Sequence, residues 1–213
     1  MMKILNKKEL HNKIQKFDLI MFDLDNTIYD EKNYDFYALK KVAIYLENKI
    51  NTKKDKIFKD LKILRLSKSN ILIFNEFLIK FNLSKKEFKF LVKNSLKIFQ
   101  LYNCKNLTKV SSLKSLIRDS YIKKDLFLVT NGHPIRQMNK INSLNIKKYF
   151  KKIFILDGKK KKLKPSIESV KYLLKPIKKF GNKNSVYIGD NLDVDKKFAK
   201  NLKISFLHFK FDK

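Results

Sequence analysis

From Leu107 onward, short apolar runs alternate with segments in which apolar residues recur every three or four positions. The short runs predict strands and the periodic segments predict helices. The expected strands span residues 126–129, 153–156, 186–188 and 204–208, and the expected helices span residues 111–119, 134–144, 166–179 and 194–201. This alternation predicts a parallel sheet with right-handed crossovers.

A further apolar run, at residues 17–22, predicts one more strand near the N-terminus. Residues 1–16 mix Lys, Glu, His and Asn, and they predict a short amphipathic helix beside this strand. No apolar stretch among them is long enough for a signal peptide or a membrane span, so we expect no membrane partner.

The segment at residues 33–106 reads as helical and contains no catalytic pattern. Its apolar spacing predicts helices at residues 34–48, 53–67, 70–81 and 84–101. Ser84, with Glu87 three places on, predicts a capping box at the last of these helices. We therefore expect an α/β core at residues 1–32 and 107–213, and an inserted helical domain at residues 33–106.

Two carboxylates follow the first strand, where Asp23 and Asp25 stand one residue apart and Thr27 adds a hydroxyl. Ligands of open α/β sheets bind beyond the carboxyl ends of the strands. Two acids in one pocket repel each other unless a cation neutralises them, so the pair implies bound Mg²⁺. Asp23 then resembles a carboxylate nucleophile and Asp25 a general acid/base. The alternative for this segment alone is an acidic β-turn.

Two later segments carry groups that suit a phosphoryl ligand. Thr130, Asn131 and Gly132 end the strand at residues 126–129, and they can donate hydrogen bonds to a phosphoryl oxygen. Lys164 follows the strand at residues 153–156 and is expected to open a helix. Its ammonium can hold a nucleophilic carboxylate and a phosphate together.

An acidic loop follows the strand at residues 186–188 and contains Asp190, Asp193 and Asp195. Such a loop is suited to complete a Mg²⁺ site. Each of these elements alone is a weak signal. Four strand ends that carry acid, hydroxyl, lysine and acid in this order are a strong one together.

This order resembles the four motifs of the haloacid dehalogenase (HAD) superfamily of phosphotransferases, and the resemblance covers nearly the whole chain. It implies an α/β fold with a Rossmann-like parallel sheet core flanked by helices. The inserted helical domain would be a cap of the C1 type. Such a cap would close over the site, exclude water and select the substrate.

The resemblance also implies roles for individual residues. Asp23 would be the nucleophile that becomes an aspartyl phosphate, and Asp25 the acid/base that also gives its backbone carbonyl to Mg²⁺. Thr130 corresponds to the hydroxyl of the second motif and Lys164 to the lysine of the third. Both of them, with Asn131 and Gly132, would bind the phosphate.

The metal would be held by Asp23, Asp25 and Asp190, with Asp195 as the usual second acid of the metal loop. The sequence leaves open whether Asp193 or Asp195 supports the metal. The pattern also departs from the family in this loop, because Asn191 stands where a serine is common.

Asp25 separates two reaction classes within the superfamily. Members that cleave carbon–halogen bonds lack an acid at this position, since a halide leaves without a proton whereas an alkoxide needs one. The sequence therefore indicates a Mg²⁺-dependent phosphatase acting on a small phosphorylated metabolite. A sugar-phosphate mutase would use the same four motifs and stays open as an alternative.

A narrower resemblance indicates the class of substrate. Residues 22–29 are similar to the opening of pyrimidine 5′-nucleotidase-like members, which favours a nucleoside monophosphate, with a sugar phosphate as the alternative. Several aromatic side chains of the helical domain can stack on a base or sugar, or form the core of that domain: Phe36, Tyr37, Tyr45, Phe74, Phe77 and Phe81.

The formal net charge of +30 invites a nucleic-acid hypothesis. Yet only three of the 50 basic residues are arginine, the residue that nucleic-acid surfaces favour. The spread of lysine with abundant Asn and Ile indicates a coding bias, which argues against functional nucleic-acid binding. The competing reading is a catalytically silent, basic HAD-like module that binds nucleic acid or another acidic partner.

Two smaller features complete the expectations. The lone Cys104 forbids an internal disulfide and fits a reducing cytoplasm. Separately, we expect a monomer or a homodimer. The four lysines at residues 159–162 either concentrate anionic substrates or form a solvated loop.

Overall fold

The computed structural model describes residues 3–67, 72–104, 107, 113–159 and 162–211. It divides the chain into two compact units, which we call the core unit (Met1–Glu31 with Lys105–Lys213) and the helical unit (Lys32–Cys104). Some predicted positions lie outside the described residues: 70–71 and 111–112 in two helices, 160–161 in the lysine run, and 106 at the domain boundary.

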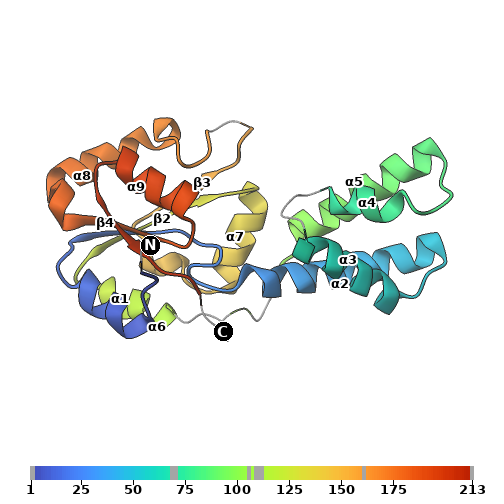
Figure 1. Ribbon diagram of the computed structural model, residues 1–213, viewed down its shortest axis with the longest axis horizontal. Helices are drawn as coiled ribbons and strands as arrows, with labels where there is room; N and C mark the ends of the chain where they lie inside the picture. Colours follow the sequence, from blue (N-terminus) through green and yellow to red (C-terminus); the bar gives the residue numbers. More distant parts are fainter. Residues whose placement is uncertain (1–2, 68–71, 105–106, 108–112, 160–161, 212–213) are drawn as a thin grey trace. The chain divides into compact units, whose positions relative to one another are not determined.

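The described part of the core unit holds one five-stranded sheet (Figure 1). Its strands are β1 (Leu19–Phe22), β2 (Asp125–Asn131), β3 (Lys152–Leu156), β4 (Ser185–Gly189) and β5 (Ser205–His208). They run in the order β3-β2-β1-β4-β5, and each pairing is parallel. The predicted α/β fold with a Rossmann-like parallel sheet is thus confirmed. Since β1 is central, its carboxyl end lies between those of β2 and β4.

Helices cover both faces of this sheet. They are α1 (Lys7–Ile14), α6 (Lys114–Ser120), α7 (Pro134–Ser143), α8 (Leu174–Phe180) and α9 (Lys197–Asn201). Figure 1 shows α8 and α9 on one face, with α1 and α6 on the other. Alternate strand residues such as Leu19, Met21 and Val129 share one buried cluster with residues of α8 and α9, as the two-residue period of a strand requires.

The predicted helix at residues 166–179 is interrupted in the structure. A 3-10 segment, Glu168–Leu173, precedes α8, and the backbone leaves helical geometry at Val170 (φ −128°, ψ 25°). Pro176 explains where the regular helix starts again. It lies in the first turn of α8, the part of a helix in which a residue without an amide hydrogen is tolerated.

The predicted helix at residues 194–201 starts two residues earlier and begins with a wide turn. Leu192–Lys196 forms a π-helical turn that leads into α9. Asn191 caps this turn, because its side-chain oxygen accepts hydrogen bonds from the backbone nitrogens of Asp193 (2.9 Å) and Val194 (3.0 Å).

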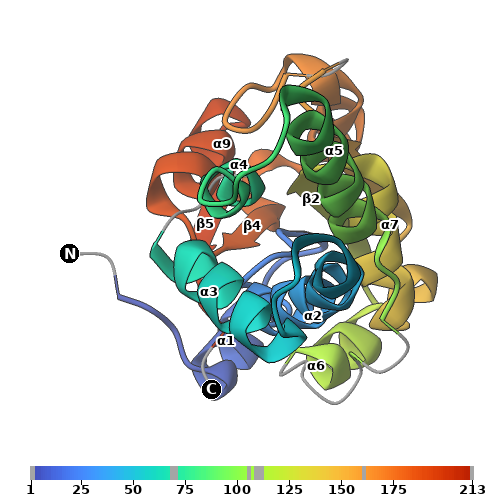
Figure 2. The same cartoon turned by 90° about the vertical axis from the view of Figure 1, so that its right-hand side faces the viewer.

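The helical unit contains α2 (Glu31–Ile50), of which the first residue, Glu31, still belongs to the core unit. It also contains α3 (Lys54–Ser67), α4 (Ile73–Leu78) and α5 (Lys85–Leu101), and Figure 2 views several of these helices nearly end-on. The predicted capping box is confirmed. The Ser84 hydroxyl accepts from the Glu87 backbone nitrogen, and the Glu87 carboxylate accepts from the Ser84 backbone nitrogen at 2.9 Å. No helix in the described residues is both long and apolar enough to cross a membrane.

Most of the aromatic residues singled out in the helical unit belong to its core. Phe74 and Phe77 are buried in this core, and Phe36, Tyr45 and Phe81 are partly buried and pack against it. Tyr37 differs, since half of its surface is exposed.

The two ends of the helical unit are joined to each other. The Tyr34 hydroxyl donates a hydrogen bond to the Tyr102 carbonyl, and the two rings meet edge to face with centroids 5.4 Å apart. Cys104, close to Tyr102, is buried and free.

Candidate active site

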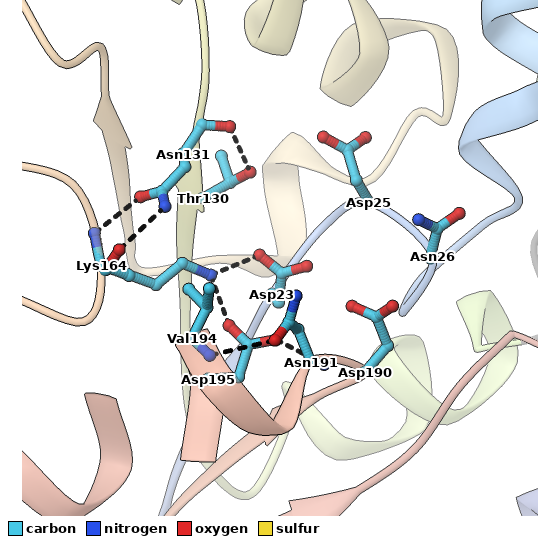
Figure 3. Close-up of a pocket in the computed structure, with 10 residues that line it drawn as sticks. All are labelled: Asp23, Asp25, Asn26, Thr130, Asn131, Lys164, Asp190, Asn191, Val194 and Asp195. Carbon is cyan, nitrogen blue, oxygen red and sulfur yellow. Dashed lines mark hydrogen bonds and ion pairs between the residues drawn. The ribbon is translucent and has the colours of Figure 1, made fainter. Parts of the chain in front are cut away.

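A cavity of about 210 Å³ opens at the carboxyl ends of β1, β2 and β4 (Figure 3). Its lining consists of Asp23, Asp25, Asn26, Thr130, Asn131, Lys164, Asp190, Asn191, Val194 and Asp195. The predicted site residues, which are far apart along the chain, therefore lie in one pocket, apart from Gly132, which is not among these lining residues. This placement follows from the parallel sheet, in which the ends of neighbouring strands meet at one edge.

Three carboxylates converge in this pocket. One oxygen each from Asp23, Asp190 and Asp195 lies within 4.8 Å of the other two. Burial raises the pKa of Asp23 well above its usual range despite the nearby Lys164 ammonium, and the charges of Asp195 and Asp25 add to the rise. Burial and the Asp195 carboxylate raise the pKa of Asp190 to about 6. Crowded oxygen ligands whose charged forms are disfavoured suit a hard divalent cation such as Mg²⁺.

Lys164 supplies the positive charge beside these acids. Its ammonium lies 2.6 Å from Asp23 Oδ1 and 2.8 Å from Asp195 Oδ1. Although burial lowers the pKa of Lys164, the carboxylates of Asp23 and Asp195 raise it above its usual value, so the ammonium stays charged. Asn131 fixes the backbone here, because its side-chain oxygen accepts from the Lys164 backbone nitrogen at 2.9 Å.

Tyr187 is a further partner of Lys164 that the sequence analysis missed. Its hydroxyl oxygen lies 2.7 Å from the ammonium, and it donates to the Val129 carbonyl at 2.9 Å. The available signal was the two-residue period of β4, which places Tyr187 on the same face as Gly189, directly before Asp190.

The geometry distinguishes Asp195 from Asp193, the two acids of the metal loop between which the sequence did not decide. The Asp195 side chain is 2% exposed and contacts Lys164, whereas that of Asp193 is 88% exposed and pairs with Lys197 at 3.2 Å. Gly189 allows Asp195 to enter, since a Cβ on this glycine would lie 2.4 Å from Asp195 Oδ2. Asp195 thus belongs to the site and Asp193 to the surface.

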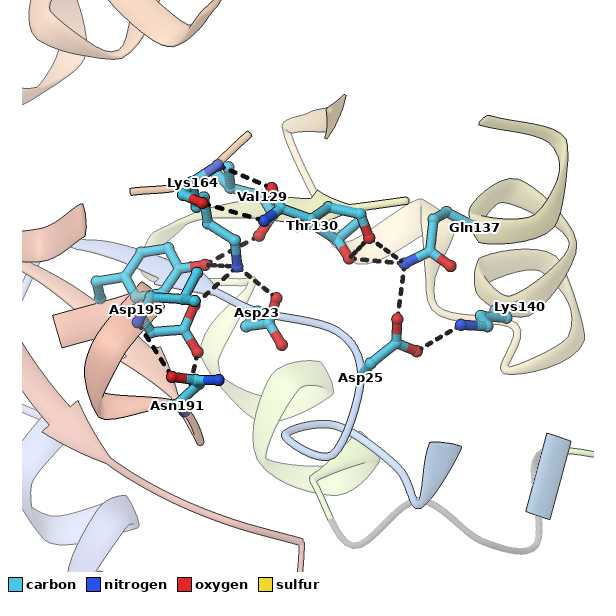
Figure 4. A network of polar contacts seen from close by, with 12 residues as sticks. Asp23, Asp25, Val129, Thr130, Gln137, Lys140, Lys164, Asn191 and Asp195 are labelled. Carbon is cyan, nitrogen blue, oxygen red and sulfur yellow. Dashed lines mark hydrogen bonds and ion pairs between the residues drawn. The ribbon is translucent and has the colours of Figure 1, made fainter. Parts of the chain in front are cut away.

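Asp25 is surrounded by donors that the sequence analysis did not identify (Figure 4). The Lys140 ammonium and the Tyr29 hydroxyl contact its Oδ1 at 2.8 and 2.5 Å, and the Gln137 amide nitrogen contacts its Oδ2 at 2.8 Å. Burial alone raises the pKa of Asp25, but the Lys140 charge and the three donors outweigh it and lower the pKa below its usual value. The carboxylate is therefore ionised.

Gly132 does not line the pocket, but it leaves room for the Gln137 side chain that contacts Asp25. Its φ of +143° lies in a range that favours glycine, and a Cβ there would lie 3.0 Å from Gln137 Cδ. Gln137 also donates to the Thr130 hydroxyl oxygen at 2.7 Å, so the glycine leaves room for the contact between α7 and the end of β2.

Two histidines and the described lysines of the run at residues 159–162 do not line the cavity. The ring of His208, to which the sequence gave no role, places Nε2 2.9 Å from the Asp190 carbonyl oxygen. His133 precedes α7 and is half-buried, but it is not among the residues that line the cavity. Lys159 and Lys162 are exposed, and Lys162 pairs with Glu168.

Residues 20–209 match the family described as haloacid dehalogenase-like hydrolase. The chain belongs to this family. Among curated proteins none matches it.

Solved structures of HAD-like proteins share its fold. A HAD hydrolase named YfnB from Bacillus subtilis, bound to magnesium and described as revealing interdomain movement, is 20% identical, with a TM-score of 0.59 over 89% of this chain and 87% of its own. A predicted phosphoglycolate phosphatase from Haemophilus somnus is 17% identical, with a TM-score of 0.56 over 92% and 87%. A 2-haloacid dehalogenase from Pseudomonas syringae is 14% identical, with a TM-score of 0.55 over 90% and 86%. At these identities the likeness establishes the HAD fold alone.

Proposed function

We propose that this HAD-like hydrolase is a Mg²⁺-dependent phosphatase that hydrolyses small phosphomonoesters through an aspartyl phosphate. The observation that carries the proposal is the presence of a second carboxylate, Asp25, in the same pocket as Asp23 and Lys164. A haloalkane carbon needs only a nucleophile, because the halide leaves unprotonated. An ester oxygen needs a proton donor as well, and Asp25 supplies that group.

In the first half of the reaction, a carboxylate oxygen of Asp23 attacks phosphorus. The bond between phosphorus and the ester oxygen breaks, and the departing alcohol takes a proton from Asp25. Lys164 and the Thr130 hydroxyl stabilise the charge that develops on the phosphoryl oxygens. This step requires the protonated form of Asp25, which the negative charge of a bound phosphate ester would favour against the Lys140 ammonium.

In the second half, Asp25 is the carboxylate again and removes a proton from water. The water oxygen attacks the phosphorus of the aspartyl phosphate, which releases inorganic phosphate and regenerates Asp23. The ionised state that Lys140 favours for Asp25 suits this step directly.

Asp23, Asp190 and the backbone carbonyl of Asp25 would hold the metal ion, with Asp195 as a supporting acid. Three carboxylate oxygens within 4.8 Å of one another, two of them from acids with raised pKa values, support this assignment. When bound, Mg²⁺ would neutralise the acids and a phosphoryl oxygen. Asp23 would then be ionised, as a nucleophile must be.

For the substrate, we propose a nucleoside monophosphate or a sugar phosphate, as in the pyrimidine 5′-nucleotidase-like members that residues 22–29 resemble. The helical unit would be the C1-type cap that selects it. Of the aromatic residues singled out there, Tyr37 is the one with half of its surface exposed, and it is the candidate for stacking on a base or sugar. We also propose a cytoplasmic monomer or homodimer.

A panel of phosphomonoesters, assayed for phosphate release with Mg²⁺, tests the proposal and the substrate class together. EDTA should abolish turnover and added Mg²⁺ should restore it, because the unneutralised acids would repel a phosphate dianion. Full activity in EDTA would contradict the metal assignment. Release of halide from a 2-haloacid, without release of phosphate from any ester, would contradict the phosphatase.

A further inference from the structure

One buried lysine of the core unit has no role in the four motifs. The Lys140 side chain, on α7, is 1% exposed, and its ammonium lies 2.8 Å from Asp25 Oδ1 and 3.2 Å from Glu31 Oε1. Removing an ammonium from water is costly unless opposite charges and acceptors replace the water. Asp25 and Glu31 offset this cost, and the pairing in turn restricts where the Asp25 carboxylate can lie.

Gln137, one helical turn before Lys140, contacts the other oxygen of the same carboxylate. Its amide nitrogen lies 2.8 Å from Asp25 Oδ2, 2.7 Å from Thr130 Oγ1 and 3.1 Å from the Asn131 carbonyl oxygen. One amide therefore connects the acid/base candidate with the phosphate-binding hydroxyl. The Thr130 hydroxyl accepts from this amide and itself donates a long hydrogen bond, of 3.4 Å, to the Asn131 carbonyl oxygen.

The direction of the carboxylate follows from these contacts. Figure 4 shows Asp25 directed toward Gln137 and Lys140, while Asp23 is directed toward Lys164. The two negative charges are thereby turned toward different cations. This arrangement keeps the charge of Asp25 from adding to the three carboxylates that already converge around Asp23, and so limits the repulsion of an incoming phosphate dianion.

We propose that Gln137 and Lys140 are positioning residues that hold the Asp25 carboxylate in this orientation and tie it to Thr130. This inference rests on the proposed phosphatase function. It adds residues outside the four motifs to the machinery of the reaction, and these residues act through Asp25 and Thr130, not on the substrate.

The test compares two variants with a matched control. Lys140→Met removes the cation, and Gln137→Met removes the amide without leaving an unpaired charge, so it covers the case in which Lys140→Met fails to fold. Lys124→Met is the control, because Lys124 is a partly buried lysine of the core unit that donates to the carbonyls of Gln15 and Phe17, away from Asp25. Kinetics are measured with an alkyl and an aryl phosphate in Mg²⁺, and the Asp25 side chain is located in crystal structures.

We expect each positioning variant to lower kcat for the alkyl ester about 10- to 100-fold, the usual effect of a misplaced catalytic group, with little change in KM. The burst of phenolate from the aryl ester should be largely retained, because phenolate leaves without a proton. In the crystal structures the Asp25 carboxylate should turn away from its parental position. Lys124→Met should lower Tm and leave kcat and the Asp25 orientation unchanged.

An unmoved Asp25 carboxylate in both variants would overturn the inference, whatever their activity. The inference would also be overturned if the variants slowed the first step equally for alkyl and aryl esters, or if Lys124→Met changed the kinetics in the same way. Either result would indicate a general disturbance of the fold. If the parent protein releases no phosphate from any ester, the proposed function fails, and the crystallographic comparison still decides whether Gln137 and Lys140 orient Asp25.

Discussion

At the scale of single residues, Asp23 and Asp25 show how neighbours differentiate identical side chains. They are one residue apart, yet burial raises the pKa of Asp23 while the contacts of Asp25 with Lys140, Gln137 and Tyr29 overcome burial and lower its pKa. Pairs of acids whose surroundings shift their pKa values in opposite directions are typical of sites in which one acid attacks and the other transfers protons. The difference leads to separate expectations for the two carboxylates.

Asp23→Asn removes the charge of the attacking oxygen, so every phosphomonoester should lose turnover alike. Asp25→Asn removes a proton donor, and an ester with a basic leaving group should lose about 10²–10⁴-fold. An aryl phosphate should still give a burst of phenolate with the Asp25→Asn protein, followed by slow turnover, because water activation is also lost. Rapid-mixing measurements of phenolate release distinguish these outcomes. Equal slowing of the first step for alkyl and aryl esters would show that Asp25 is no general acid.

Asp190 provides an expectation for pH. Its folded-state pKa of about 6 lies above the usual 3.8, so the folded protein holds this proton more tightly than the unfolded chain. This contribution to stability is fully present below pH 4 and is lost as the pH rises through 6. In EDTA, the Asp190→Asn protein should therefore have a Tm a few degrees above that of the parent at pH 7 to 8. For a protein of this size, each kcal/mol of added stability raises Tm by about 2–4 °C. The difference should close below pH 4.

Asp193→Asn is the control for this comparison, because Asp193 belongs to the same loop but its side chain is 88% exposed. Its Tm difference from the parent should not vary with pH in the same way. Calorimetric melting curves at several pH values measure both proteins. A pH-independent Tm difference in Asp190→Asn would contradict the raised pKa.

At the scale of elements, the sequence identified site residues most directly where they follow the end of a strand. Asp23, Thr130 and Asp190 each follow an apolar run directly, and the parallel sheet brings such ends together. Gln137, Lys140 and Tyr187 could not be assigned in this way, because helix or strand period gives only the face on which they lie. Their partners come from other segments and are set by tertiary packing.

The boundaries of the elements show the same limit. Apolar spacing predicted α7 and α5 nearly to their ends, since an N-terminal proline and a capping box mark their starts. It missed the interruption at Val170 and the π-helical turn before α9. In the second case Asp195, inside the turn, is directed toward Lys164, a contact between segments that no local pattern records.

The close approach of Gly189 to Asp195 gives an expectation for the end of β4. Gly189→Ala would place a methyl group against Asp195 Oδ2, which must move and weaken its ion pair with Lys164. We expect a loss of about 1–3 kcal/mol in stability from overpacking, and a kcat lower by about 10- to 100-fold. Thermal melting and steady-state assays measure the two effects.

Gly181→Ala separates these effects from backbone strain. Gly181 has a φ of +86°, but a Cβ there would meet no atom within 4 Å. This variant should lose stability through strain alone and keep its kcat. Parental activity in Gly189→Ala would show that the position of Asp195 is unimportant for turnover.

At the scale of the whole molecule, the charge of +30 is the property most apt to suggest another function. If the lysines reflect coding bias, duplex DNA should bind weakly and without sequence preference. Its affinity should fall steeply as salt increases, because counterion release would supply all of it. Fluorescence anisotropy over a salt series tests this. Sequence-specific binding at physiological salt that survives Asp23→Asn would support the silent module.

The contact between Tyr34 and Tyr102 has a consequence for the order of folding. The central pairing of β1 with β2 joins Leu19 to Asp125 across the entire helical unit, so the chain must close a long loop before this pairing forms. A helical unit that is already folded holds Tyr34 beside Tyr102 and removes most of that loop. Because closure entropy grows with the logarithm of loop length, this lowers the entropic cost of the first parallel pairing by about 1 kcal/mol. An inserted domain whose two ends are held together thus helps the sheet that it interrupts to assemble.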